Sequence, residues 1–239
     1  DSAIAVTVEA GNAGTATASA SITGLTSGST VTVNDSKDAT GGVAALTVGY
    51  KALEAAATID VNSVKANAAV TINNVTAATI DYAKSASSAT AGISTDVTTS
   101  LNIIAAKDVN TGAITSNNKL KTLTITGQDA VTTTTVTSTA LETVTVSGVK
   151  ATQITDMVEA GKLKTVNVTS TTDLVSVGDI GAANKNNTTD ALNITVSAAK
   201  AATLGAVGHA TGSGKLGDIS VTATNGLLTA GAITGTDAG

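Results

Sequence analysis

The chain has 239 residues, 42% of which are apolar, and carries a formal net charge of −5 at pH 7. It has no Cys, so disulfide bonds are excluded, and Tyr50 and Tyr82 are its only Phe, Tyr or Trp residues, so an aromatic-rich core is excluded as well. The acidic balance leaves no basic patch for nucleic acid, and no run of about 18 apolar residues is available to span a membrane. The apolar content is too high for a disordered chain, and it predicts a narrow core of Val, Ile, Leu and Ala that is built repeatedly.

Residues 1–50 contain four strand-like runs in which apolar and polar residues alternate: Ile4–Val8, Ala16–Ile22, Thr30–Val33 and Val43–Val48. Their spacing is irregular and does not match the period found further along the chain. We therefore expect residues 1–50 to form an irregular N-terminal β cap, or the end of a preceding module. The chain begins at Asp1 without Met or a signal peptide, which indicates a mature form or a fragment.

A regular period begins at Ile59. Eight apolar–polar–apolar triplets follow one another at nearly constant intervals, and only the last two intervals are clearly longer. Their leading residues are Ile59, Ile80, Leu101, Leu123, Val144, Val166, Leu192 and Ile219. A period of this length is typical of a solenoid, in which each repeat pairs with its neighbours. The sequence therefore predicts a mainly β protein in which residues 51–239 form a parallel, right-handed β-solenoid of about eight coils of 21–27 residues.

A second apolar position falls about midway through most coils, which predicts at least two strand faces per coil, joined by corners of small residues. These positions are Ile72, Ile93, Ile114, Val136, Met157, Val177, Leu204 and Ile233. The two longer intervals place their additional residues at 183–188 and 209–214, which are polar and are expected to be loops. The segment Thr152–Lys162 is expected to include a short helical turn that ends at Gly161.

Three coils share a Leu-x-x-apolar-x-apolar phrase at Leu120, Leu141 and Leu163, which resembles the strand segment of leucine-rich repeats but lacks the Asn that closes it. The chain resembles more closely the solenoid-forming crystalline regions of Gram-negative surface-layer proteins and related large secreted adhesins. This resemblance rests on the Thr-, Ala-, Val-, Asn- and Gly-rich, Cys-free composition and on phrases such as Leu141–Gly148. It implies an extracellular location at a bacterial cell surface. The final Gly235–Gly239 is similar to the start of calcium-binding glycine- and aspartate-rich nonapeptides, but no complete nonapeptide is present.

The outward residue of each triplet forms a predicted row across the coils. The row is Asp60, Asp81, Asn102, Thr124, Thr145, Asn167, Asn193 and Ser220. Asp60 and Asp81 would stack about 4.8 Å apart, so a bridging cation would relieve their repulsion, and Asn102 would add an oxygen of the kind that Ca²⁺ binds. Asp60 and Asp81 are therefore the candidate calcium ligands, and the alternative is two solvated surface carboxylates. Asp35 and Asp38 form a second, less complete acidic group in an N-terminal turn.

Threonine-rich outward columns give another candidate surface. They contain Thr122, Thr143, Thr165, Thr124, Thr145, Thr126 and Thr169. Such columns resemble the flat ice-binding faces of β-helices, and the alternative is an ordinary solvated face, because Thr is a good strand residue. His209 is the only histidine and lies in a Gly-rich segment, so no nucleophile–histidine–carboxylate set is indicated.

These features predict a non-enzymatic structural protein that assembles with itself into a surface layer or a matrix fibre, because stacked coils leave an open edge to which another chain can add. The alternative is an adhesin or binding module that uses the lateral face, with a cell-surface glycan or lipopolysaccharide as partner. Two tyrosines provide few stacking platforms for sugars. A polysaccharide lyase, which also uses β-solenoids, needs a groove of basic and acidic residues, and the predicted stack places no basic residue beside Asp60 and Asp81.

Overall fold

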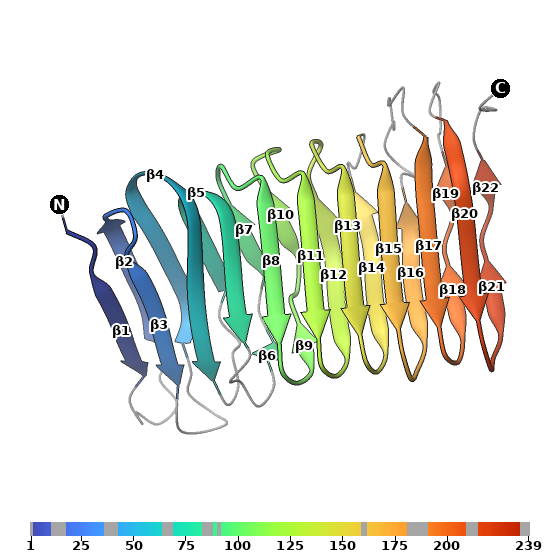
Figure 1. Cartoon of the computed structure of the whole chain (residues 1–239), viewed down its shortest axis with the longest axis horizontal. Coiled ribbons are helices and arrows are strands. Elements are labelled where there is room, and N and C mark those ends of the chain that lie inside the picture. The colour runs from blue at the N-terminus through green and yellow to red at the C-terminus, as the bar shows by residue number, and fades with distance from the viewer. Residues whose placement is uncertain are drawn as a thin grey trace.

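The computed structural model describes residues 2–10, 18–35, 43–63, 69–82, 88–89, 92–158, 162–180, 191–208 and 215–234. Within these residues the chain is all β and contains no helix. Its strands lie side by side in one long stack, with the N-terminus at one end and the C-terminus at the other (Figure 1). Every strand pairing is parallel, so the predicted parallel β-solenoid is confirmed.

The first face of the solenoid is a ladder of ten strands among the described residues. These are β1 (Ala5–Ala10), β3 (Thr30–Asp35), the C-terminal parts of β4 (Val43–Ser63) and β5 (Ala69–Tyr82), then β8 (Ser100–Ala105), β11 (Thr122–Gly127), β13 (Thr143–Gly148), β15 (Thr165–Ser170), β17 (Leu192–Ala198) and β20 (Leu216–Ala223). The strands from β4 to β20 form the eight predicted coils.

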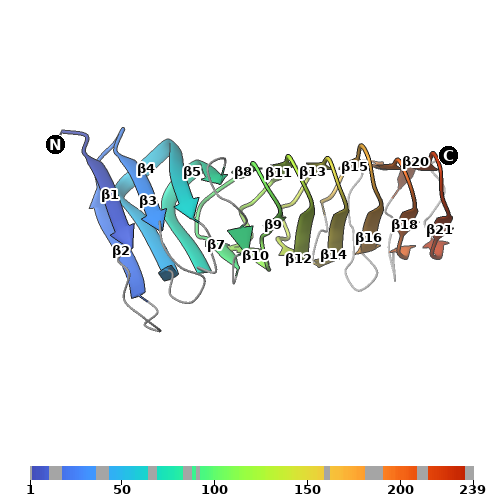
Figure 2. The ribbon, with the colours of Figure 1, turned by 90° about the horizontal axis from the view of Figure 1, so that it is seen from below.

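The second face lies on the opposite side of the rod, and in several coils it is divided into two short strands (Figure 2). It contains β2 (Ala18–Leu25), the N-terminal parts of β4 and β5, then β6 (Ser88–Ala89), β7 (Ile93–Thr95), β9 (Val109–Asn110), β10 (Ile114–Ser116), β12 (Val131–Thr137), β14 (Thr152–Val158), β16 (Val175–Ile180), β18 (Ala202–Leu204), β19 (Val207–Gly208), β21 (Leu228–Ala230) and β22 (Ile233–Thr234). The prediction of two strand faces per coil is confirmed.

The core lies between the two faces and contains few residue types. On β11, buried and half-buried residues alternate, so that Leu123, Ile125 and Gly127 point inward. The buried apolar side chains along the rod form one continuous cluster, made of Val, Ile, Leu and Ala with Tyr50, Tyr82 and Met157. This is the narrow, repeated core that the composition predicted.

The described strands within residues 1–50 belong to the same parallel stack. Val6 pairs with Val31, and Val31 pairs with Ile59, so the first two coils are longer than the central ones and differ in length from each other. The boundary expected at residue 50 falls inside β4, because this strand runs through a corner without interruption from the second face to the first. The longer and unequal coils explain why the period is not visible in this part of the sequence.

The stacking register differs from the predicted one at three steps of the first face. Ile80 pairs with Ile103 rather than with Leu101. Val166 and Ile219 both pair with Ile194 rather than with Leu192. All three errors are shifts of two residues, which keep every side chain on its predicted side of the sheet and are therefore invisible to an alternating pattern.

The second-face column is also corrected in part. It consists of Ala20, Leu46, Val70, Ile93, Ile114, Val136, Met157, Ile180, Val207 and Ile233. Ile72, Val177 and Leu204 lie two or three residues away from their predicted places in this column, although each of them is buried.

Each coil from β12 to β19 bends within its second face. Along this face, successive side chains point in, out, in, out, out and in. On β12 the inward ones are Val131, Thr133 and Val136. The two successive outward residues mark the bend, and later coils place Gly178 or Gly205 there. A Cβ atom at Gly178 would overlap the carbonyl oxygen of Thr155, so the backbones of neighbouring coils approach too closely for a side chain.

The helical turn expected within Thr152–Lys162 is wrong for its described part. Residues Thr152–Val158 form β14, which pairs with β12 on one side and β16 on the other. Ile154 and Met157 are buried in the core, so burial and ladder pairing outweigh the local helix preference of this segment. Gly161 lies outside the described residues.

Candidate functional site

Asp60 and Asp81 lie opposite each other on neighbouring coils of the first face, as predicted. Thr32 lies beside Asp60 on one side of this row, and Ile104 lies beside Asp81 on the other. Asn102 pairs with Thr79 and therefore lies in the adjacent row, so its prediction as the next donor of this row is wrong. The pair keeps its two carboxylates but has an apolar side chain where the third oxygen donor was expected.

A second carboxylate pair was not predicted. Asp156 of β14 and Asp179 of β16 are partners at the bend of the second face. Asp179 Oδ1 accepts a hydrogen bond of 2.8 Å from the backbone N–H of Ala206 in the next coil, so this carboxylate closes the bend. The signal in the sequence was that the two aspartates are separated by the length of one coil. Within the described part of the chain, no three Asp, Glu, His or Cys side chains come together as a metal cluster.

Oppositely charged side chains pair between neighbouring coils at the corners. At the corner before the first face, Glu142 lies between Lys121 and Lys164, with Nζ–Oε distances of 3.6 and 3.7 Å. At the opposite corner Lys150 pairs with Asp129. The hydrogen bond to Asp129 raises the pKa of Lys150 above its ordinary value. The lysine side chains are largely exposed, so these pairs add little to stability, and their main effect is to favour one register.

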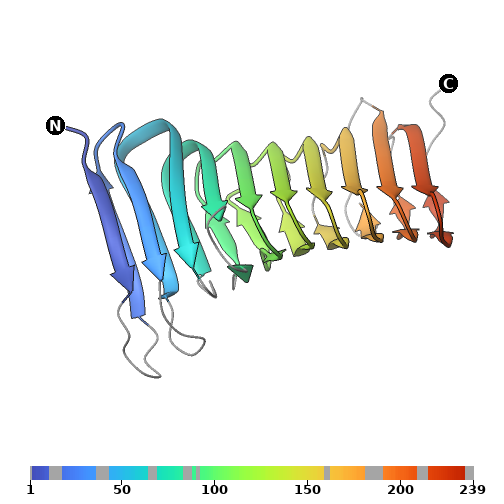
Figure 3. The same ribbon diagram turned by 60° about the horizontal axis from the view of Figure 1, so that its bottom comes forward.

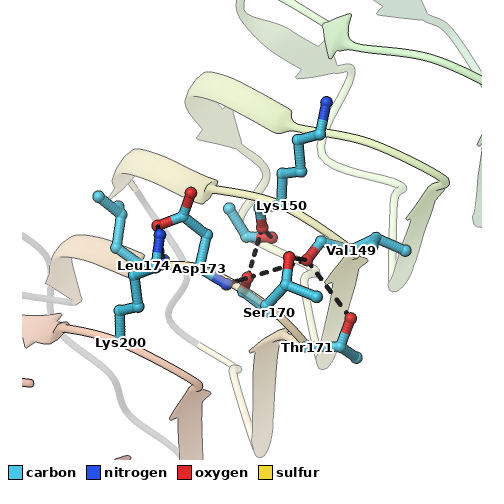
Figure 4. Close-up of polar contacts among 9 residues, drawn as sticks. Val149, Lys150, Ser170, Thr171, Asp173, Leu174 and Lys200 are labelled. Atoms are coloured by element: carbon cyan, nitrogen blue, oxygen red, sulfur yellow. Dashed lines mark hydrogen bonds and ion pairs between the residues drawn. The ribbon is translucent and has the colours of Figure 1, made fainter. Parts of the chain in front are cut away.

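Ser170 anchors the corner at which the first face ends (Figure 4). Its hydroxyl donates a hydrogen bond of 2.5 Å to the carbonyl oxygen of Lys150 and accepts one of 3.1 Å from the N–H of Asp173. Asp173 in turn pairs with Lys200 of the next coil, 3.3 Å away. The bonds of Ser170 are made to the backbone, and together with the ion pair they tie three coils together, so this hydroxyl is structural.

Both tyrosines are in the core. Tyr50 is 3% exposed and Tyr82 is 1% exposed. Burial raises the pKa of Tyr82 well above its ordinary value, and burial followed by the charge of Glu54 raises the pKa of Tyr50. Because these are the only Tyr, Phe or Trp residues, no such ring stands on the surface as a platform for a sugar.

The threonine columns are in register across three central coils. They form a block of nine outward residues: Thr122, Thr124, Thr126, Thr143, Thr145, Ser147, Thr165, Asn167 and Thr169. Asn102 and Ile104 interrupt the same columns one coil earlier. Toward the C-terminus the columns continue through Thr195 and Ser197 of β17 and through Ser220 and Thr222 of β20, so this polar surface runs from β11 to the last described coil.

Several predicted features fall outside the described residues. These are His209, Asp38 and the loops 183–188 and 209–214. Asp35 is described only as the last residue of β3. The described part of the chain includes no helix with the length and apolarity needed to cross a bilayer.

The fold and these surfaces define a repeat protein of the β-solenoid class. No protein family, no curated protein and no solved structure matches this chain. A function for this chain is therefore inferred from its own residues.

Proposed function

We propose that this chain is a non-enzymatic, extracellular structural protein of a bacterial cell surface, whose solenoid assembles with further copies into a surface layer or a matrix fibre. The observation that carries the proposal is the apolar surface of the last described coil. Leu227, Leu228 and Ile233 are 74%, 47% and 46% exposed. The partners of Leu228 and Ile233 in the preceding coil, Ala202 and Val207, are at most 1% exposed.

The first described coil has the same character. Ile4 is 52% exposed, and Val6 and Val8 are only partly buried, whereas their partners Val31 and Val33 are buried. Figure 3 shows the two end coils, blue and red, each with a neighbour on one side only. A further coil stacked against either end would bury these side chains and pair the backbone groups of the edge, and in the proposed assembly this coil belongs to another copy. Joining unlike ends in this way propagates into a filament.

The size of the apolar contribution predicts weak association. Burying the exposed parts of Leu227, Leu228 and Ile233 contributes about 3 kcal/mol to the free energy of association. The loss of translational and rotational freedom on association costs about 4–15 kcal/mol. The backbone pairing of the whole edge must supply the remainder. Assembly should therefore depend strongly on protein concentration.

The cell-surface location rests on the composition and on the resemblance to surface-layer proteins. An anchoring partner such as a surface glycan or lipopolysaccharide belongs to the same proposal. The burial of both tyrosines disfavours the alternative of an adhesin that stacks sugars on its lateral face.

Multi-angle light scattering of the purified chain over a concentration range tests the proposal. We expect the average mass to rise with concentration, with and without millimolar calcium. The double substitution Leu228→Lys and Ile233→Lys should keep the chain monomeric, because charged edges block strand addition. Leu53→Lys is the matched control, since Leu53 is 67% exposed but lies in β4, which is paired on both sides, with β2 and with β5. A wild-type chain that stays monomeric at every concentration contradicts self-assembly.

A further inference from the structure

The corner between β20 and β21 carries the only Asn-Gly dipeptide of the sequence, Asn225 followed by Gly226. Both residues are exposed and lie in a bend. The backbone N–H of Asn225 donates a hydrogen bond of 3.0 Å to the carbonyl oxygen of Ala199 in the preceding coil, which fixes the start of the corner. A side-chain amide of Asn can be attacked by the next backbone nitrogen, and a following Gly hinders that attack least because it has no Cβ.

The packing of the corner requires the glycine. A Cβ atom added at Gly226 would lie 2.7 Å from the carbonyl carbon of Lys200, so the backbones of the two coils approach too closely for a side chain. The fold therefore keeps a glycine at this position, whatever residue precedes it.

The two groups of the dipeptide that would react are free of hydrogen bonds. Neither the side-chain amide of Asn225 nor the backbone N–H of Gly226 has a partner among the described residues. Asn193 is also exposed, but its Oδ1 accepts a bond of 3.0 Å from the N–H of Asp218 and its Nδ2 donates one of 3.3 Å to the carbonyl oxygen of Ala191. The Asn225 amide is therefore free to rotate toward the following nitrogen, whereas the Asn193 amide is held.

We propose that Asn225 is a site of spontaneous deamidation, at which the chain modifies itself without an enzyme. The Gly226 nitrogen loses its proton to base in the solvent and attacks Cγ of Asn225. The new C–N bond closes a succinimide ring, the bond from Cγ to Nδ2 breaks, and Nδ2 leaves as ammonia. Water then opens the ring at either carbonyl, which leaves aspartate or isoaspartate at position 225. An intramolecular attack of this kind is efficient where the reacting atoms can come into contact.

The isoaspartate product changes the pairing of the last described coil. Its linkage runs through the former side chain and adds a methylene group to the backbone directly before Leu227. The carbonyl oxygen of Leu227 accepts a hydrogen bond of 3.0 Å from the N–H of Ala202, which pairs with Leu228 in the ladder. Isoaspartate therefore weakens the pairing of β21 with β18. The reaction is intramolecular, so the proposal is independent of self-assembly.

Peptide mapping by mass spectrometry, after incubation of the folded, dilute chain at neutral and at mildly alkaline pH, tests the site. A synthetic peptide of residues 221–229 gives the rate of the same sequence without the fold. We expect Asn225 to react fastest among the asparagines of the described residues. Its rate should lie within about tenfold of the peptide's, or about 1.4 kcal/mol of activation free energy, and should rise with pH because the nitrogen must lose its proton.

Lys119→Gly is the matched control, because it places a glycine after Asn118, which is also exposed. Oδ1 of Asn118 accepts a hydrogen bond of 3.3 Å from the N–H of Thr139. In this variant Asn118 should therefore react several-fold more slowly than Asn225 of the same molecule. Equal rates at the two sites would overturn the proposal, since the free amide would then not select Asn225.

Hydrogen exchange of the Ala202 amide provides a second measurement. Exchange should become faster as the wild-type chain accumulates isoaspartate, and it should stay constant in Asn225→Gln, whose longer side chain would have to close a larger and less favourable ring. Circular dichroism verifies that each variant is folded. An Asn225 that stays unmodified in the folded chain, or that reacts more than about tenfold more slowly than the peptide, overturns the proposal.

Discussion

The hydroxyl of Tyr50 donates a hydrogen bond of 2.7 Å to the carbonyl oxygen of Ser29, one coil earlier in the chain. Ser29 is buried, so this bond satisfies a carbonyl that little water can reach. The hydroxyl of Tyr82, which is equally buried, has no partner among the described residues. Both tyrosines thus lie in the core, but the hydroxyl of Tyr50 is hydrogen-bonded, whereas that of Tyr82 has no partner among the described residues.

We predict that removing these two hydroxyls has different effects. Tyr50→Phe should lower the free energy of unfolding by about 0.5–1.5 kcal/mol, because the Ser29 carbonyl loses its partner. Tyr82→Phe should leave the stability unchanged or raise it, since an unpaired buried hydroxyl is lost. Urea unfolding followed by far-ultraviolet circular dichroism measures both. Equal destabilisation by the two substitutions would contradict this assignment.

Alkaline pH should destabilise the solenoid through Tyr82. In the unfolded chain a tyrosine ionises near pH 10, whereas burial raises the pKa of Tyr82 well above that value in the folded chain. Above about pH 10 the unfolded state therefore binds fewer protons, and stability falls as the pH rises toward the folded pKa. Below about pH 10 the contribution is constant.

The measurement for this prediction is urea unfolding of wild type and Tyr82→Phe at several pH values from about 8 to 11.5, which bracket the ordinary tyrosine pKa. The stability of the variant should decline less steeply with pH. Parallel curves would show that Tyr82 ionises at the same pH in the folded and unfolded chains.

The sequence predicted the inward and outward sides of the strands better than the register. A shift of one residue would expose Leu101 and bury Asn102, which the alternating pattern excludes. A shift of two residues exchanges Leu101 for Ile103, which the same pattern accepts. The register therefore depends on how many residues each corner contains. In a chain without proline, the sequence gives few signs of where a corner begins or ends.

The pairing of the two first-face carboxylates could be predicted because the register assumed from the sequence is correct at that step. Asp60 and Asp81 face each other because the coil that separates them has the regular length assumed in the alignment. Asn102 fell out of the row because the next coil is longer by two positions.

Close packing at the bend predicts that Gly178→Ala is destabilising. The added methyl would overlap the Thr155 carbonyl, and the backbone cannot move without disturbing the neighbouring coils. Overpacking of this kind costs about 1–3 kcal/mol. Gly49→Ala is the matched control, since a methyl group added there would lie 3.5 Å from its nearest neighbour, Thr23 Cγ2, at ordinary contact distance. Thermal unfolding should separate the two, and similar midpoints would show that the bend can relax.

Removing one carboxylate of the first-face pair should stabilise the chain. Like charges directly opposite on neighbouring strands are unfavourable, and such cross-strand pairs amount to about 0.2–1 kcal/mol. Asp60→Asn should therefore raise the free energy of unfolding by a few tenths of a kcal/mol at low salt. The gain should shrink near 1 M salt, where the screening length falls to about 3 Å. Asp218→Asn is the control, because Asp218 is exposed and its backbone N–H donates a hydrogen bond to the side chain of Asn193 in the neighbouring coil.

The same variant separates repulsion from cation bridging. If Asp60 and Asp81 were bridged by calcium, Asp60→Asn would destabilise the chain in millimolar calcium and have the opposite effect after chelation. Repulsion alone predicts the same sign of change in both conditions, because no ion is lost. Urea unfolding of wild type and variant, with calcium and with a chelator, therefore decides between two solvated carboxylates and a metal site. A reversal of sign would establish the metal site.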